Sequence, residues 1–167
     1  VDADVRIGHI HRGMEKLFEQ RTYMQNIHIT ERICGICSFT HSTNFCQATE
    51  YILGVEPPRR GLYLRTLMNE FERIHSHLLW LGAFPADLGA LTPFMYAFDD
   101  REQILDILED ITGSRLTYCY FRFGGVRYDL PDGWVEKCRA LMKDMPKLID
   151  QYESLVNDNA IFLQRTM

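Results

Sequence analysis

The chain has 167 residues, of which 46% are hydrophobic and 25% charged, the proportions of an ordinary globular domain. This composition excludes a disordered tail, a collagen-like repeat and a small scaffold held together by disulfides. The net charge of −5 comes from 18 basic and 23 acidic residues without a basic stripe, so no nucleic-acid partner is expected.

The beginning of the chain shows only short structural patterns. Hydrophobic and polar side chains alternate over residues 4–9, which predicts a short strand. Gly13 then leads into Met14–Gln20, a run of good helix formers that predicts a short helix. Residues 26–35 have no helical period, and we expect them to form an ordered loop.

Two longer helices are predicted in the middle of the chain. The first covers Ser38–Leu53 and ends at Gly54, a residue suited to the left-handed position after a helix. The second begins at Pro58, since proline is tolerated in a first turn, and runs to about Leu81. Apolar residues recur along it at steps of three and four, which indicates one continuous apolar face. Gly82, Pro85 and Gly89 are expected to interrupt this second helix.

The same helical spacing continues toward the end of the chain. A helix is predicted over Arg101–Ile111, and another from Asp132 to Met142. Between them, residues 116–126 are aromatic and prone to β structure, and Pro146 opens a last helix. The predicted fold is therefore mainly α: an antiparallel helix bundle with a small β appendage at the N-terminus and near 116–128.

The five cysteines include one closely spaced pair, Cys34 and Cys37. Without a secretory signal the thiols should stay reduced, so a metal or redox role is favoured over a disulfide framework. Two thiolates at this spacing can bind one metal from the same side of a turn, and Gly35 permits the backbone that this requires. No second pair follows at zinc-finger spacing, and a thioredoxin-type site would need alternating strands and helices. On spacing alone, two buried structural cysteines are the alternative.

Histidines accompany the cysteine pair and the long helix. His41 follows Cys37 by about one helical turn, so its ring can face the pair and donate a hydrogen bond to a thiolate. A buried, hydrogen-bonded histidine is the alternative for this residue. His75 and His77 are two positions apart in a helix, point to different faces and are expected to pack or to contact a partner. The other thiols are predicted to be inert: Cys46, Cys119 and Cys138.

The residues around the cysteine pair resemble a known family. The segment Glu31–His41 resembles the first metal-binding motif of [NiFe] hydrogenase large subunits, Arg-x-Cys-Gly-x-Cys-x-x-x-His. Further segments are similar to the superfamily shared by membrane-bound, energy-converting [NiFe] hydrogenases and the 49-kDa component (the D subunit) of respiratory complex I. These segments are His11–Leu17, Asn69–Leu78, Gly89–Phe94, Gly124–Val126 and Asp129–Pro131.

This resemblance implies roles for the residues of the motif. Cys34 corresponds to the terminal thiolate on nickel and Cys37 to the thiolate that bridges nickel and iron, while His41 orients a thiolate. These three residues form the predicted catalytic set, with the two cysteines as metal ligands of a Ni–Fe centre. Arg32 would place a fixed positive charge beside the cluster, or else cap the loop.

The resemblance also implies partners. His11 and Arg12 are similar to residues that lie near an iron–sulfur cluster in a partner small subunit, where a cation stabilises the reduced cluster. A surface pair of residues is the alternative for them. The expected partners are this small subunit, other subunits of a membrane-bound complex I-like assembly, and the remaining C-terminal half of the same subunit.

The ends of the chain bear on its organisation and location. The acidic start lacks a signal peptide and an initiator methionine, and the uncharged run Ile74–Ala86 is too short to span a bilayer. The family completes its Ni–Fe centre with a second cysteine pair near the C-terminus, which is absent before Met167. Residues 1–167 are thus expected to be one domain, the N-terminal half of a large subunit that is inactive alone. Its expected location is cytoplasmic, peripheral to the membrane through its complex.

Three functions follow from these observations. The leading prediction is the catalytic subunit of a hydrogenase, which interconverts H2 with protons and electrons and passes electrons to the iron–sulfur subunit. The quinone-reducing branch has lost the thiols and places a tyrosine near Gly35, although Gly89–Phe94 resembles that branch as closely. The alternative is therefore a quinone-binding, electron-transfer subunit of an NADH:quinone oxidoreductase-type complex without a working Ni–Fe centre. A helical interaction domain with a structural metal is the third hypothesis.

Overall fold

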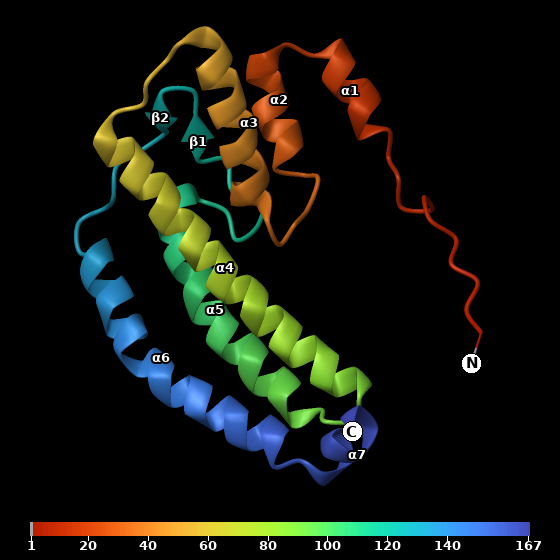
Figure 1. Cartoon of the computed structure of the whole chain (residues 1–167). Coiled ribbons are helices and arrows are strands. Elements are labelled where there is room, and N and C mark those ends of the chain that lie inside the picture. Colours follow the sequence, from red (N-terminus) through yellow and green to blue (C-terminus); the bar gives the residue numbers. More distant parts are fainter. Residues whose placement is uncertain (1) are drawn as a thin grey trace.

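The computed structural model describes residues 2–167, which form seven helices and one two-stranded sheet (Figure 1). The predicted mainly α class is confirmed. Within residues 2–167, no helix combines the length and the hydrophobicity that a membrane-spanning segment needs. In chain order the elements are α1 (Met14–Gln20), α2 (Tyr23–Thr30), α3 (Ser38–Leu53), α4 (Arg59–Asp87), α5 (Thr92–Thr112), β1 (Phe121–Arg122), β2 (Gly125–Val126), α6 (Trp134–Asn157) and α7 (Ala160–Thr166).

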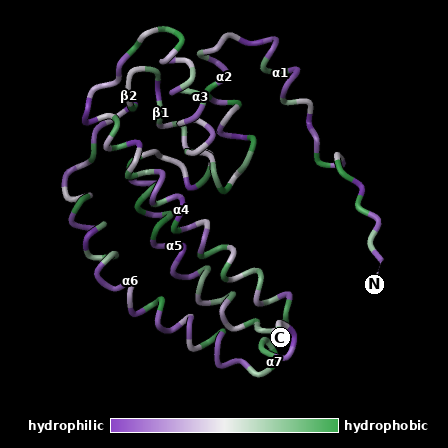
Figure 2. The backbone as a smooth tube through the Cα atoms, in the orientation of Figure 1, coloured by the Kyte–Doolittle hydropathy of each residue, from purple (hydrophilic) through white to green (hydrophobic). Residues whose placement is uncertain are grey.

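The three long helices α4, α5 and α6 lie side by side, and α1–α3 with the small sheet gather at one end of them (Figure 1). Hydrophilic and hydrophobic residues alternate along these long helices (Figure 2), as expected of amphipathic helices that bury one face. Buried residues of α5 include Ile104 and Leu108, which pack with Met68 and Phe71 of α4 in a common core. Trp134 closes the core at the start of α6 and donates a hydrogen bond of 2.9 Å from its indole nitrogen to the Ile107 carbonyl.

The predicted end of the long helix near Leu81 is wrong, because α4 continues to Asp87 through Gly82 and Pro85. Gly82 is buried where α4 crosses α5, and a Cβ atom there would lie 3.2 Å from the Cβ of Ala97. Glycine at this position thus permits close packing of the two helices rather than ending one. Proline removes only one backbone donor and lies within the last turn, where α4 ends two residues later.

Other boundaries also differ from the prediction. Helix α5 begins at Thr92 instead of Arg101, with Pro93 in its first turn, where proline needs no hydrogen-bond partner. Helix α6 runs through Pro146 as one helix where two were predicted. The predicted helix Ser38–Leu53 is confirmed, and Gly54 adopts the left-handed conformation with φ of 67°.

The N-terminal β appendage and the predicted loop are wrong. Residues 2–13 contain no strand, and this segment extends away from the helices with Ile7 94% exposed (Figure 1). Alternation of side chains alone does not make a strand when no partner strand is at hand. Much of the predicted loop is α2, which begins at a capping box between Thr22 and Gln25.

The second β appendage is confirmed as a short hairpin. Phe121 pairs with Val126 and Arg122 with Gly125 in an antiparallel ladder. The aromatic segment before it is buried against α3, where the rings of Phe39 and Tyr118 stack with centroids 4.2 Å apart. This packing brings residues 118–122 next to the end of α2 and the start of α3.

Candidate functional site

The cysteine pair lies in the loop between α2 and α3, and Cys37 is the residue that precedes the first turn of α3. The hydroxyl of Ser38 donates hydrogen bonds of 2.9 Å to the carbonyl oxygens of Glu31 and Cys34. Ser38 is buried, so this interaction fixes the loop from both of its ends. These hydrogen bonds therefore hold the backbone around the cysteine pair in place.

The structure brings Cys34, Cys37 and His41 together. One ligand atom from each of them, the two Sγ atoms and a ring nitrogen, lies within 4.8 Å of the others, and all three side chains are half-buried. The donor set of two thiols and one imidazole suits soft or borderline transition metals. The geometry agrees with the predicted set, while the roles of these residues stay a prediction.

The two thiols have different acidities. Burial raises the pKa of Cys34, but the Cys37 thiol and the backbone N–H groups of Ile36 and Cys37 outweigh it, and the net pKa is lowered. Burial, the hydrogen bond and charge of Cys34, and the nearby Glu72 carboxylate raise the pKa of Cys37 to about 12. The pair therefore releases its first proton, from Cys34, more readily than its second, from Cys37. A bound metal would displace the second proton.

Glu72 of α4 anchors the first turn of α3 beside the pair. Its carboxylate accepts hydrogen bonds from the backbone N–H groups of Phe39 at 2.6 Å and Thr40 at 2.9 Å, and from the Thr40 hydroxyl at 3.0 Å. Burial raises the pKa of Glu72, while these three donors oppose the shift. An acidic group at a helix N-terminus satisfies otherwise unpaired N–H groups, so Glu72 fixes the orientation of α3.

His11 and Arg12, predicted to lie near the partner's iron–sulfur cluster, share another surface with Arg32, which was predicted to place a charge beside the Ni–Fe centre or to cap the loop. His11, Arg12 and Arg32 line one hollow with Ile33 and Phe18. The His11 ring lies 2.8 Å from the Glu15 carboxylate, and Arg32 donates to the His28 carbonyl oxygen at 2.7 Å. Glu15 also lines the hollow, so two arginines stand against one carboxylate and the exposed hollow is net basic.

One cluster was missed in the sequence. Cys119, predicted to be inert, lies 2.7 Å from the Nδ1 atom of His28, although the two residues are 91 positions apart. Glu31 completes this group, with one ligand atom from each residue within 4.8 Å of the others. Burial raises the pKa of Glu31 to about 8. Only the packing of the hairpin against α2 and α3 creates this proximity, so no local pattern could reveal it.

The remaining cysteines and the paired histidines fit packing roles. Cys46 and Cys138 are buried, and burial raises the pKa of each to about 11. His75 is fully buried with its Nε2 atom 3.4 Å from the Tyr118 hydroxyl. His77 instead lines an apolar cavity, as expected for two residues that face different sides of one helix.

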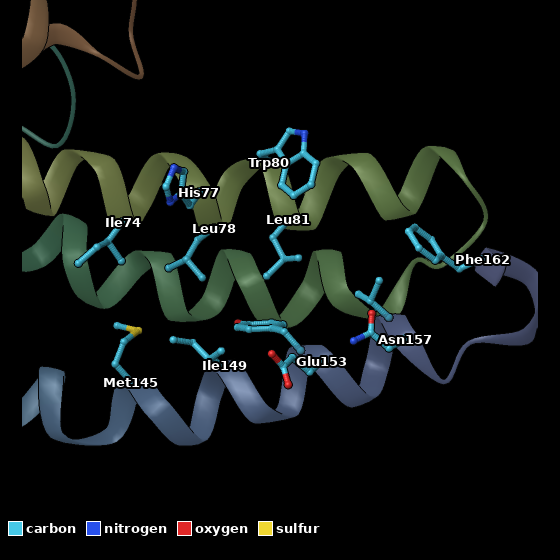
Figure 3. Close-up of a pocket in the computed structure, with 12 residues that line it drawn as sticks. Ile74, His77, Leu78, Trp80, Leu81, Met145, Ile149, Glu153, Asn157 and Phe162 are labelled. Carbon is cyan, nitrogen blue, oxygen red and sulfur yellow. The ribbon is translucent and has the colours of Figure 1, made fainter. Parts of the chain in front are cut away.

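That cavity lies between α4 and α6 and has a volume of about 890 Å³ (Figure 3). Leu78 and Leu81 of α4 face Met145 and Ile149 of α6 across it, and Phe162 of α7 lies at one end. Trp80, on the rim, is 59% exposed. The long α4 helix therefore leaves apolar surface uncovered in this chain.

Two protein families match successive parts of the chain. Residues 12–86 match the family described as nickel-dependent hydrogenase. Residues 87–167 match the family described as the 49-kDa subunit of respiratory-chain NADH dehydrogenase. The first match contains the cysteine pair, and the second begins where α4 ends.

Similar proteins are named as subunits of NADH-quinone oxidoreductases or of an F420H2 dehydrogenase. The chain is 46% identical over 166 residues to the C/D 2 subunit of the Aquifex aeolicus NADH-quinone oxidoreductase, covering 99% of this chain and 28% of that protein. It is 41% identical over 167 residues to the D subunit of the Methanosarcina mazei F420H2 dehydrogenase, covering 100% and 45%. The D subunit of the Geobacillus kaustophilus NADH-quinone oxidoreductase is 44% identical over 164 residues, covering 98% and 45%. The chain thus spans less than half the length of these relatives.

Proposed function

We propose that this chain, which belongs to the superfamily of the respiratory complex I 49-kDa subunit and the nickel-dependent hydrogenases, is part of a D-type subunit of an NADH-quinone oxidoreductase-like complex. The observation that carries the proposal is the match, along 98 to 99% of the chain, to proteins named as the D or C/D subunits of such complexes. This subunit would help to bind the quinone, which accepts electrons from the complex. The rest of the subunit would come from sequence beyond these residues.

The proposed assembly is peripheral to the cytoplasmic face of a membrane, with an iron–sulfur small subunit among its partners. The basic hollow of His11, Arg12 and Arg32 supports this partnership. A reduced iron–sulfur cluster carries additional negative charge, and nearby cations stabilise it. The uncovered cavity between α4 and α6 gives the remaining part of the subunit, or a neighbouring subunit, an apolar face to bind.

The cysteine pair supports a second candidate, a hydrogenase that interconverts H2 with protons and electrons. In that enzyme Cys34 and Cys37 would hold a Ni–Fe centre with a second pair from the rest of the subunit, and His41 would orient a thiolate. The centre, when bound, supplies the cleavage and formation of H2. This chain would provide a fixed loop and two half-buried cysteine thiols that differ in pKa.

A charge-reversal experiment tests the lead proposal. The complex is purified from its own membranes through a tag on this subunit, and NADH-dependent reduction of a soluble quinone analogue is measured. Arg12→Glu with Arg32→Glu should lower recovery of the iron–sulfur subunit and quinone reduction about tenfold, because two attractive charges become repulsive. Arg139→Glu, on the exposed side of α6, is the matched control. Unchanged recovery and activity in the double variant would refute the proposed partner surface.

A further inference from the structure

A separate group of metal-ligand side chains lies where α2 meets the segment before β1. His28 is in the last turn of α2, Glu31 follows this helix directly, and Cys119 lies two residues before β1. One imidazole nitrogen, one carboxylate oxygen and the Sγ atom lie within 4.8 Å of one another. None of these residues belongs to the group of Cys34, Cys37 and His41.

The Glu31 carboxylate gives this group an unexplained feature. Its side chain is 1% exposed, and neither of its oxygens has a hydrogen-bond partner in the part of the chain that the structure describes, residues 2–167. The Arg32 guanidinium lies 3.9 Å from one oxygen, beyond hydrogen-bond distance. Buried carboxylates are normally hydrogen-bonded or bound to a cation. The Glu31 carboxylate therefore needs a partner that the side chains and backbone of residues 2–167 do not provide.

We propose that His28, Glu31 and Cys119 bind one divalent cation of the zinc type. Imidazole, carboxylate and thiolate are the three ligands that Zn²⁺ takes in proteins. His28 is exposed and Cys119 is half-buried, so water can reach the site and could serve as the fourth ligand. The Arg122 guanidinium donates a hydrogen bond of 3.4 Å to the Cys119 sulfur and holds this side chain beside His28.

The geometry requires one adjustment. The sulfur of Cys119 lies 2.7 Å from His28 Nδ1. Ligand atoms around tetrahedral zinc are about 3.5 Å apart, as follows from bond lengths of about 2.0 to 2.3 Å. The imidazole must therefore move outward by about 1 Å. An exposed side chain can do this by rotating about its side-chain bonds, and the buried Glu31 can stay in place.

Such a cation would join parts of the chain that are distant in sequence. It would tie α2 to the hairpin segment across 91 positions. It would also fix Glu31, where the cysteine loop begins. The carbonyl oxygens of Glu31 and Cys34 accept hydrogen bonds from the same Ser38 hydroxyl, so Glu31 is connected to the cysteine pair. The proposal stands apart from the proposed function, since it uses neither quinone nor hydrogen chemistry.

Metal titration of the full chain tests this site. A Cys34→Ser/Cys37→Ser background removes the other cluster, and Zn²⁺ affinity is measured there by competition with a chromophoric chelator. We expect one Zn²⁺ per chain, and Co²⁺ in its place should show a thiolate charge-transfer band. His28→Ala and Glu31→Gln should each weaken Zn²⁺ binding at least tenfold, and Cys119→Ser should abolish the cobalt band.

The controls separate loss of the site from loss of the fold. Cys138→Ser removes a buried thiol that belongs to neither cluster, and it should leave the affinity unchanged. His28 is exposed, so His28→Ala keeps the fold, which circular dichroism verifies. Failure of the cysteine background to bind stoichiometric Zn²⁺ overturns the proposal. So does an unchanged affinity in His28→Ala.

Discussion

Arg65 of α4 and Glu50 of α3 form a doubly hydrogen-bonded ion pair in the interior of the protein. The Nη1–Oε2 distance is 2.9 Å and the Nη2–Oε1 distance 2.5 Å, and the two side chains are 2% and 5% exposed. The same guanidinium donates to the carbonyl oxygens of Gly125 and Arg122 in the hairpin. Arg65 thus joins α3, α4 and the sheet at the end of the molecule that carries the cysteine loop.

Arg65→Met should strongly destabilise the protein. Among residues 2–167, it leaves the buried Glu50 carboxylate with the Gly124 N–H as its one remaining donor, and breaking a buried pair from one side costs about 3–5 kcal/mol. Urea unfolding followed by circular dichroism measures the change. Arg60→Met removes an exposed pair with Asp129 and should cost about 1 kcal/mol or less. Equal effects of the two substitutions would contradict the role given to Arg65.

Glu72→Gln should loosen the start of α3. The amide keeps the shape of the side chain but loses the charge that accepts two backbone N–H bonds, so we expect a loss of about 1–3 kcal/mol in unfolding free energy. Cys37, next to the first turn, should react faster with a thiol reagent. Glu70→Gln on the exposed face of α4 is the matched control and should change neither quantity. The prediction fails if the Glu70 variant loosens Cys37 as much.

The buried His75 should make stability depend on pH. Burial, together with the charge of Arg101, lowers its pKa to about 4 from the ordinary value of 6.5. The unfolded chain binds a proton as the pH falls below 6.5, while the folded chain binds it only near pH 4. His75 therefore contributes its full stability above pH 6.5 and loses roughly 3 kcal/mol of it as the pH falls to about 4.

Unfolding free energies of His75→Gln measured between pH 7 and pH 4 check this expectation. The variant should lose less stability than the parent protein over this range. His77→Gln, two residues along the same helix but exposed to the cavity, should follow the parent protein. Parallel pH profiles for His75→Gln and the parent would show that His75 is not the titrating group.

The cavity between α4 and α6 should bind an apolar dye (Figure 3). Ile149 lies in this cavity and is 52% exposed, so Ile149→Glu should lower the fluorescence of bound anilinonaphthalene sulfonate by about half. Leu116→Glu changes a comparably exposed leucine that does not line this cavity, and the dye signal should stay unchanged. Equal losses in both variants would place the dye elsewhere.

Local signals in the sequence predicted local features of the fold. Gly54 ends α3 as expected, because a left-handed residue after a helix favours glycine. Gly82 and Pro85 were misjudged, since close packing with α5 and a position in the last turn decide their effect. The proximity of Cys34, Cys37 and His41 follows from short spacing. The contact between His28 and Cys119 depends on tertiary packing alone.

The cysteine pair offers the most direct way to distinguish the proposed D-type subunit of a quinone-reducing complex from a hydrogenase subunit. Nickel content, quinone reduction and hydrogen–deuterium exchange are measured on the whole complex carrying Cys34→Ser/Cys37→Ser and on its parent. For the quinone-reducing complex we expect a parent without stoichiometric nickel. Quinone reduction should stay within about twofold in the variant, because a soft ligand pair matters only to a metal that is bound. Stoichiometric nickel and hydrogen–deuterium exchange in the parent, both lost in the variant, would contradict this expectation in favour of the hydrogenase.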